Sequence, residues 1–346
     1  RSFGISDIKT GVGKTGVVAS LRLGSSDRSI ALRADMDCLP IHETTNLTYA
    51  STKPDLMHAC GHDGHTTMLL GAASRLACEG GFDGTVHFVF QPAEEWGQGM
   101  KSMIDDGLGS TITFDEIYGL HNMPGLPVGK FETRAGAFMG AEDGFVITVH
   151  GTGGHASRPH ECHDAIVCAC SIVNELQTVV SRAIDPADLA VVSVTSIAGD
   201  NVKNAISNTA RIEGDCRHFS DAVSQSIETS IKRIASGITS AHGCTVDIAY
   251  DRVFVPLIND AKAVEHCVRA ANSVFGAENV DAHGAPMGAS EDFARALTLA
   301  PGAFAIIGNG ESAPLHNSGY DFNDDALGYG MNWFVELTRQ RLNPHT

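Results

Sequence analysis

Apolar and polar residues follow two different rhythms along the first part of the chain. Residues 29–37, 85–90 and 116–120 form apolar runs of strand length. Between them, residues 65–78 and 102–108 place apolar side chains at the spacing of a helix. Strands that alternate with helices in this way predict a mainly parallel sheet with helices on both faces.

The middle of the chain follows another order. A strand, a helix, two strands, a helix and a final strand are predicted, which is the β-α-β-β-α-β order of a ferredoxin-like sheet backed by two helices. The predicted strands are residues 144–150, 190–197, 208–216 and 244–253, and the predicted helices are residues 164–183 and 224–240. We therefore predict an inserted domain that serves as a lid or a dimerisation domain.

Alternating helix and strand return afterwards, at residues 261–275, 303–307 and 326–341. The predicted fold class is thus α/β with an inserted ferredoxin-like domain, and a chain of 346 residues is also too long for one ordinary core. The predicted domains are a discontinuous metal-binding catalytic domain of residues 1–141 and 255–346 and an inserted domain of residues 142–254.

Composition narrows the classes of partner. A formal charge of −17 argues against nucleic acid and against anionic membranes, because both are bound through dense lysine and arginine. No apolar run approaches the roughly 18 residues of a membrane span. Nine cysteines without a framework spacing favour a reducing compartment, so we expect the cytoplasm.

The beginning of the chain contains a misleading glycine pattern. Residues 11–16, Gly-Val-Gly-Lys-Thr-Gly, match a dinucleotide-binding pattern on paper, but residues 17–23 alternate like a strand where that motif requires a helix. We predict a glycine-rich hairpin turn. The first residues lack the pattern of a secretion signal, and because Arg1 is not a methionine, we expect that an N-terminal segment is missing.

Side chains that can bind metal gather near the ends of apolar runs. Cys60 and His62 stand two positions apart around a glycine, a spacing that lets a thiolate and an imidazole face one ion. The further candidates are Asp35, Glu94, Glu95, His121 and His316. Because ligands collect beyond the carboxyl ends of parallel strands, we expect one shared site, in a two-metal hydrolase that acts on an amide bond.

Five motifs make this interpretation more specific. They are His58-Ala-Cys-Gly-His-Asp-Gly-His65, Gln91-Pro-Ala-Glu-Glu95, Gly119-Leu-His121, Gly153-Gly-His-Ala156 and Ser290-Glu-Asp-Phe293. In this order the chain resembles the M20 metallopeptidases over nearly its whole length. The similarity is closest to the amidohydrolase branch, which includes hippurate hydrolases, N-acyl-amino-acid deacylases and indole-acetyl-amino-acid hydrolases.

The resemblance implies a set of metal ligands. Cys60 takes the position of the ligand that bridges both ions, His62 and His121 complete one ion, and Glu95 and His316 complete the other. Zinc and manganese both suit such a mixed site, and nickel and cobalt also fit. His58 and His65 are left outside the ligand set, and Asp35 and Asp37 are expected to orient the histidines.

The resemblance also implies catalytic and substrate-binding residues. Glu94 is the expected general base, and its neighbour Glu95 can bind metal only if the chain bends, because adjacent side chains of a strand point oppositely. His155 from the inserted domain is expected to stabilise the oxyanion. The substrate is expected to be an N-acyl amino acid, with Asn204 and Arg217 as candidate partners of its carboxylate.

Three residues remain open at this stage. Trp96 and Arg158 depart from the small residues usual in the family; Trp96 forms a wall of the site or fills core. Glu291 faces substrate or begins a helix.

The two-domain layout suggests hinges near Ala141 and Val255 that close over substrate. A homodimer through the inserted domain is expected, since relatives are often dimers and exposed sheet edges can pair.

Other functions fit parts of this pattern. A dipeptidase or carboxypeptidase of the same fold would use the same metal site. A thiol hydrolase would use Cys60 with His62 as its base, leaving the adjacent glutamates without a role. A non-catalytic metal-binding protein is the third alternative, and the intact base at Glu94 argues against it.

Overall fold

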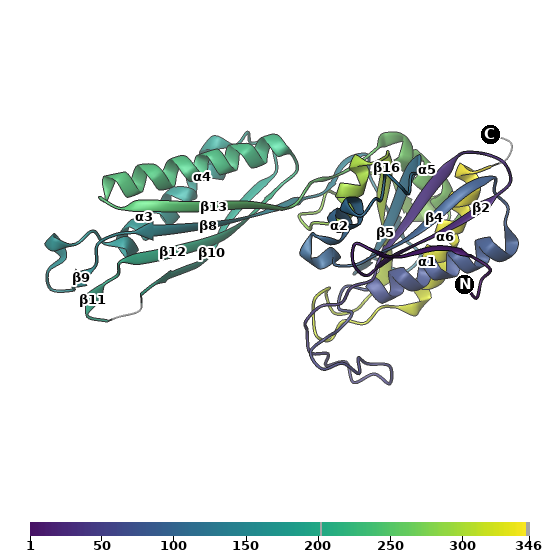
Figure 1. The fold of residues 1–346 in the computed structure, drawn as a ribbon, viewed down its shortest axis with the longest axis horizontal. Coiled ribbons are helices and arrows are strands. Elements are labelled where there is room, and N and C mark those ends of the chain that lie inside the picture. The colour runs from purple at the N-terminus through teal and green to yellow at the C-terminus, as the bar shows by residue number, and fades with distance from the viewer. Residues whose placement is uncertain (201–202, 344–346) are drawn as a thin grey trace. The chain divides into compact units, whose positions relative to one another are not determined.

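A computed structural model describes residues 1–200 and 203–343 (Figure 1). The chain divides into two compact units. The small unit comprises Met139–Pro256 and Met287–Ser290, and the large unit comprises Arg1–Phe138, Leu257–Pro286 and the chain from Glu291 onward. In the described part of the chain, no helix is long and apolar enough to cross a membrane.

The large unit is built on an eight-stranded sheet in the order β1-β2-β4-β3-β5-β16-β6-β15. The central strands β4, β3, β5 and β16 are parallel, whereas β1 and β2 add antiparallel strands at one end and β6 pairs antiparallel with β16 near the other. The strands are β1 (Asp7–Val12), β2 (Gly16–Leu23), β3 (Ser29–Asp35), β4 (Gly84–Gln91), β5 (Glu116–Pro124), β6 (Phe131–Glu132), β15 (Val280–Asp281) and β16 (Gly302–Gly310).

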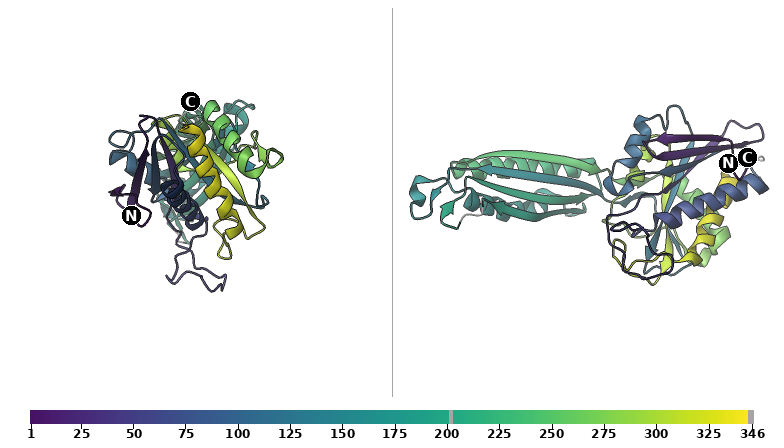
Figure 2. Two further views of the ribbon diagram at one scale, coloured as in Figure 1. Left: turned by 90° about the vertical axis from the view of Figure 1, so that its right-hand side faces the viewer. Right: turned by 60° about the horizontal axis from the view of Figure 1, so that its bottom comes forward.

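Helices cover both faces of this sheet, as the sequence predicts (Figure 2). On one face, α1, α5 and α6 bury a continuous core that includes Leu32, Phe88 and Trp333. On the other face, α2 and the 3₁₀ segment η5 lie against β4, β5 and β16. The helical segments are α1 (His62–Glu79), η1 (Glu94–Trp96), α2 (Gly99–Asp105), α5 (Ala261–Phe275), η4 (Ala277–Asn279), η5 (Asp292–Thr298), η6 (Asp324–Ala326) and α6 (Leu327–Arg341).

Strand alternation decides which side chains reach the second face. In β3, Ile30, Leu32 and Ala34 belong to the core under α1, α5 and α6. The intervening Arg33 and Asp35 therefore point to the opposite face, although both are fully buried. Polar side chains inside a buried sheet need polar partners, so a cluster of polar groups is expected on this face.

The small unit has the predicted β-α-β-β-α-β order. Its four strands pair antiparallel in the order β10-β12-β8-β13, and α3 and α4 bury Phe145, Ile147 and Ile212 against them. Its segments are β8 (Ala141–His150), β9 (Gly154–His155), η2 (Pro159–Glu161), α3 (Ala165–Leu176), the π-helical η3 (Val179–Ala183), β10 (Ala190–Gly199), β11 (Ala205–Ile206), β12 (Thr209–His218), α4 (Asp221–Ala241) and β13 (Thr245–Phe254). Two short strands, β7 (Gly136–Met139) and β14 (Leu257–Asn259), pair with each other.

The glycine-rich segment near the start of the chain is a hairpin, as predicted. β1 and β2 pair antiparallel, and Lys14 between them has a left-handed φ of 74°. The backbone N–H of Gly13 donates to Asp106 Oδ2 at 2.8 Å. No helix begins here, so the segment lacks the geometry of a phosphate-binding loop.

Candidate metal centre

The five predicted metal ligands lie together at the carboxyl-end side of the large sheet. Cys60 and His62 stand at the start of α1, His121 in β5, Glu95 in η1, and His316 in the segment after β16. Their ligand atoms form two groups, each within 4.8 Å: Cys60, His62 and His121, and Cys60, Glu95 and His316. Cys60 is therefore shared by both groups, which is the geometry that a bridging ligand requires.

Gly61 lets the chain bring Cys60 and His62 to the same place. Its φ of 87° is left-handed, and a Cβ at this position would lie 2.3 Å from Asn122 Oδ1 and 2.7 Å from the Tyr320 hydroxyl. Only glycine fits such a close approach without strain.

A backbone bend brings both glutamates to the site, which the sequence analysis required. β4 ends at Gln91, and Ala93 then adopts a left-handed φ of 51°, which is rare for a residue with a side chain. Glu94 and Glu95 follow in a 3₁₀ turn, held by a hydrogen bond from the Glu95 backbone N–H to Asp37 Oδ2 at 3.1 Å. Glu94, Glu95 and His62 then offer ligand atoms within 4.8 Å of one another.

The histidines are oriented with one nitrogen towards the cluster. His62 Nδ1 donates to the backbone carbonyl of Asp37 at 3.1 Å and to its carboxylate at 3.2 Å. His121 Nδ1 donates to the carbonyl of Asn122 at 2.6 Å, and its Nε2 lies 3.4 Å from Cys60 Sγ. Asp37 thus orients a histidine, and this is the arrangement usual for imidazoles that bind metal through Nε2.

Unpartnered atoms show that these residues fit a divalent cation. Within the described chain, His62 Nε2 and Glu95 Oε1 are buried without a hydrogen-bond partner, although His316 Nε2 lies 3.3 Å from Glu95 Oε1. Each such atom costs about 1–3 kcal/mol when it stays unsatisfied. A cation with affinity for nitrogen, oxygen and sulfur would satisfy both atoms, together with the Cys60 sulfur.

His65 and Asp35 lie next to the candidate ligands. His65 Nδ1 lies 2.6 Å from Asp35 Oδ1, and His65 Nε2 lies 2.8 Å from Asn122 Oδ1 and accepts from the Asn122 backbone N–H at 3.1 Å. Both nitrogens of His65 are therefore occupied, which agrees with leaving it out of the ligand set. Asp35 Oδ2 is 3.7 Å from His62 Nε2, so Asp35 contacts both histidines.

Arg33 is a site residue that the sequence analysis missed. It is fully buried and donates to Asp35, Gln91, Glu291 and Asp292. The sequence did contain an indication of this role, because an arginine in the middle of a buried strand needs several hydrogen-bond acceptors.

Glu291 caps η5 by accepting a hydrogen bond from the Phe293 backbone N–H at 2.9 Å, and it is buried. Both observations support its interpretation as the residue that begins a helix.

The charges of the cluster shift the pKa values of its members. Burial, together with Glu291 and Asp292, raises the pKa of Glu94 well above its usual range. Burial opposes the ionised form of Asp35, but His62, His65 and Arg33 lower the pKa of that carboxyl well below its usual range. A raised pKa makes the Glu94 carboxylate a better proton acceptor, as a general base requires.

The surroundings of Cys60 disfavour a thiol hydrolase. Burial, followed by Glu95 and Glu94, raises the pKa of the Cys60 thiol well above its usual range. A nucleophilic cysteine requires a lowered pKa, and the opposite holds here without a cation. A bound divalent cation would reverse this, because a coordinating thiol is deprotonated.

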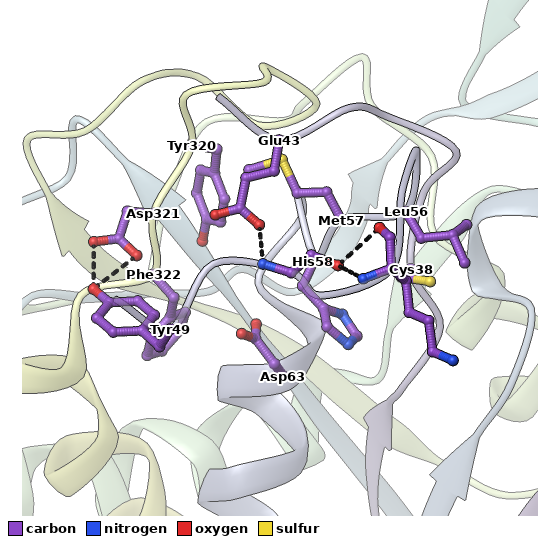
Figure 3. A pocket seen from close by; sticks show the side chains of 12 residues that line it. Cys38, Glu43, Tyr49, Leu56, Met57, His58, Asp63, Tyr320, Asp321 and Phe322 are labelled. Carbon is purple, nitrogen blue, oxygen red and sulfur yellow. Dashed lines mark hydrogen bonds between the residues drawn. The ribbon is translucent and has the colours of Figure 1, made fainter. Parts of the chain in front are cut away.

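A cavity of about 250 Å³ lies beside the segments that carry two of the ligands (Figure 3). His58, two residues before Cys60, and Asp63, directly after His62, line it together with Tyr49, Tyr320 and Phe322. None of the five ligands lines this cavity, so it neighbours the candidate metal centre without containing it.

Comparisons with known proteins agree with this geometry. Residues 31–340 match the model of peptidase family M20/M25/M40. The chain belongs to this family. It is 39% identical over 342 residues to hippurate hydrolase of Campylobacter jejuni, covering 99% of this chain and 89% of that protein. N-acetylcysteine deacetylase of Bacillus subtilis is 36% identical, covering 94% of this chain and 84% of that protein.

A solved structure of the same family extends this similarity to three dimensions. A Bacillus subtilis protein described as a dinuclear metal-binding peptidase from the M20 family superposes with a TM-score of 0.84 at 31% identity, covering 99% of this chain and 89% of that chain. The predicted M20 family and the α/β fold class are thus confirmed, and the chain is a hydrolase that acts on amide bonds.

The three residues predicted from the inserted domain of this M20 enzyme occupy two places in the small unit. His155 in β9 pairs with Ala205 in β11, and the Ala156 backbone N–H donates to the carbonyl of Asn204 at 3.1 Å. His155 is exposed, and its Nδ1 accepts a hydrogen bond from the Ser157 backbone N–H at 3.2 Å. His155 and Asn204 therefore lie side by side.

Arg217 stands in β12 of the four-stranded sheet, away from the two-stranded sheet of β9 and β11. Thr209 pairs with His150 at one end of β8, and Arg217 pairs with Glu142 at the other, eight residues away or about 26 Å along the strand. The guanidinium contacts Glu142 Oε2 at 2.7 Å, Asp215 Oδ2 at 2.9 Å and Ser290 Oγ at 2.9 Å. A substrate carboxylate would have to replace one of these partners.

The two departures from the family pattern lie on the surface. Trp96 is 65% exposed, so it does not fill core. Arg158 is exposed and forms an ion pair with Glu161. Trp96 directly follows the two glutamates, in the same 3₁₀ turn.

Proposed function

We propose that this chain is a two-metal amidohydrolase that cleaves N-acyl amino acids into a carboxylic acid and a free amino acid. The observation that carries the proposal is the sharing of Cys60 by two groups of ligand atoms, with Glu94 within 4.8 Å of ligand atoms of His62 and Glu95. A base beside a two-cation cluster is the equipment that amide hydrolysis by water requires.

In this proposal Cys60, His62 and His121 would hold one divalent ion, and Cys60, Glu95 and His316 would hold the other. Zinc or manganese suits this donor set, and nickel or cobalt also fits. When bound, the ions supply Lewis acidity, which lowers the pKa of water and polarises a carbonyl. Asp37 keeps His62 in the tautomer that binds through Nε2.

Glu94 performs the proton transfers. It takes a proton from the attacking water as the carbon–oxygen bond forms, and it gives this proton to the nitrogen as the carbon–nitrogen bond breaks. The products are a carboxylic acid and an amine, and Glu94 returns to its starting state. Burial and the nearby Glu291 and Asp292 raise the pKa of Glu94, which favours it as the proton acceptor.

The proposal assigns substrate contacts to the small unit. His155 stabilises the oxyanion, and Asn204 beside it contacts the substrate carboxylate. Arg217, the other predicted partner, lies at the far end of β12 and is engaged by Glu142, Asp215 and Ser290, so it is too distant from Asn204 to contact the same carboxylate within one chain. Hinges near Ala141 and Val255 allow closure over substrate, and the small unit is the proposed surface of a homodimer. Support for the substrate class comes from the similarity to hippurate hydrolase and to N-acetylcysteine deacetylase.

The experiment that tests the proposal is hydrolysis of a substrate panel by metal-free protein with zinc or manganese restored. The panel contains N-benzoylglycine, several N-acetyl amino acids and several dipeptides. Metal-dependent release of amino acid from the N-acyl compounds is expected. Cleavage of dipeptides alone would identify a dipeptidase or carboxypeptidase, and silence with two metals bound would identify a metal-binding protein without catalysis.

A further inference from the structure

Arg33 brings together segments that are distant in the sequence. Its Nε donates to Gln91 Oε1 at 2.7 Å and its Nη1 to Asp35 Oδ2 at 2.8 Å. Its Nη2 donates to Glu291 Oε1 at 2.8 Å and to Asp292 Oδ1 at 3.2 Å. One guanidinium thus joins the ends of β3 and β4 to the start of η5.

Glu94 lies between this guanidinium's partners and the metal ligands. Carboxylate oxygens of Glu94, Glu291 and Asp292 lie within 4.8 Å of one another, and Glu94 also offers an oxygen within 4.8 Å of ligand atoms of His62 and Glu95. The Asp292 backbone N–H donates to Glu94 Oε1 at 3.4 Å. The position of Glu94 therefore depends on where Glu291 and Asp292 are held.

Three carboxylates at this distance repel one another strongly inside a protein, where water screens little. Arg33 supplies the positive charge that holds Glu291 and Asp292 side by side. Its planar fork of donors also sets their direction, which the single point charge of a lysine cannot do. Arg33 makes no hydrogen bond to Glu94 among those found in the described chain, so its hydrogen bonds can fix the position of Glu94 only through these neighbours.

We propose that Arg33 is a positioning residue for Glu94. By holding Glu291 and Asp292 against the ends of β3 and β4, it keeps the Glu94 carboxylate aimed at the attacking water. This inference rests on the proposed function of Glu94 as general base. It predicts that a change at Arg33 slows catalysis but leaves both ions bound, because Arg33 does not contact the proposed metal ligands.

The test compares Arg33→Lys with a matched control, Arg341→Lys. Arg341 also forms a double ion pair in the large unit, to Glu116 at 2.8 and 2.6 Å, and joins α6 to β5 away from the cluster. For Arg33→Lys on N-benzoylglycine, kcat is expected to fall at least tenfold, with KM and the two bound metals unchanged. Arg341→Lys should keep wild-type kcat per folded molecule. Unchanged kcat in Arg33→Lys, or loss of its metals, would overturn the proposal.

Crystal structures of the zinc-loaded wild type and Arg33→Lys provide a readout that does not need activity. The Glu94 carboxylate is expected to move by more than about 1 Å, enough to lower the rate of an oriented reaction, while the five ligands stay in place. If the wild type hydrolyses nothing in the panel, the proposed function fails, and this comparison still decides the role of Arg33. An unmoved Glu94 would overturn it.

A second variant covers the case in which Arg33→Lys does not fold. Glu291→Gln keeps the shape of the side chain and its hydrogen bond from Phe293, but removes the charge that pairs with Arg33. Because Asp292 still pairs with Arg33, a smaller loss of kcat is expected, about threefold or more, again with unchanged KM and metal content. A kcat equal to that of the wild type would contradict the proposal.

Discussion

Two buried acids, Glu94 in the large unit and Asp143 in the small unit, have opposite surroundings. Asp143 Oδ2 accepts hydrogen bonds from His218 Nε2 at 2.9 Å and from the hydroxyls of Ser224 and Tyr250, both at 2.6 Å. Glu94 accepts one long hydrogen bond, from the backbone N–H of Asp292. The protein itself therefore stabilises the charge of Asp143, whereas it leaves the charge of Glu94 largely uncompensated.

The pKa values follow this difference. Burial raises the pKa of both carboxyls, but at Asp143 the hydrogen bonds from His218, Ser224 and Tyr250 outweigh it and lower the pKa. At Glu94, nearby Glu291 and Asp292 add to the effect of burial. A carboxylate that accepts several hydrogen bonds keeps its charge and stabilises the fold, whereas one surrounded by other acids favours binding of a cation or a proton.

The largest effect is expected for Glu94→Gln, which removes the proposed base. The amide keeps the shape of the side chain but cannot accept a proton from water, so kcat should fall by about 10²–10⁴-fold or more. Both metals should remain bound, because Glu94 is outside the proposed ligand set. Steady-state kinetics with metal analysis of the same sample checks this, and retained turnover would remove Glu94 from the role of base.

Gly61→Ala should disturb the large unit through its backbone. A Cβ would lie 2.3 Å from Asn122 Oδ1 in a left-handed conformation, so the segment between Cys60 and His62 must move. Strain and overpacking together should cost roughly 2–5 kcal/mol of unfolding free energy. We expect the metal affinity to fall as well, measured by zinc titration.

Gly125→Ala is the matched control for this change. Gly125 has a similar φ of 85°, but a Cβ there meets nothing within 4 Å. The cost should be only the left-handed strain, about 1–2 kcal/mol, with unchanged zinc affinity. Equal loss of zinc affinity in both variants would show that the close approach at Gly61 does not shape the site.

That the candidate ligands lie together could be predicted from the sequence for a physical reason. Cys60, His62, Glu95 and His121 stand in short motifs at the ends of predicted elements, and parallel strands bring such ends to one edge. The two-domain pattern of apolar residues also predicted the α/β sheet and the order of strands in the small unit. These features are local in sequence, or follow from rules of chain connection.

The features that were missed depend on contacts between distant residues. Arg33 and Glu291 are 258 positions apart, and no periodicity connects them. Helix α2 begins at Gly99, three residues before the predicted start at residue 102, and the Met100 backbone N–H donates to Asp292 Oδ2 at 2.9 Å. One of the three hydrogen-bond or ion-pair partners of Arg217, Ser290, likewise belongs to a distant segment of the chain.

The last prediction concerns the small unit, where two aspartate–histidine pairs differ in burial. Asp143 pairs with His218 at 2.9 Å in the interior, and Asp247 pairs with His150 at 2.9 Å with the Asp247 side chain 84% exposed. Asp143→Asn should lower the unfolding free energy by about 1–3 kcal/mol, because buried donors lose a charged acceptor. Asp247→Asn should cost no more than about 1 kcal/mol.

The difference in unfolding free energy between wild type and Asp143→Asn should also depend on pH. Because the folded pKa of Asp143 lies below the unfolded value of about 3.9, its ionised form stabilises the unit fully above that value. This stabilisation is lost as the pH falls through the lowered folded pKa. Urea unfolding at pH 7 and at progressively lower pH should therefore show the gap between wild type and Asp143→Asn closing below about pH 4. If the difference in unfolding free energy stayed constant with pH, the charge of Asp143 would not contribute to stability. The contrast with Glu94 would then not be one of charge.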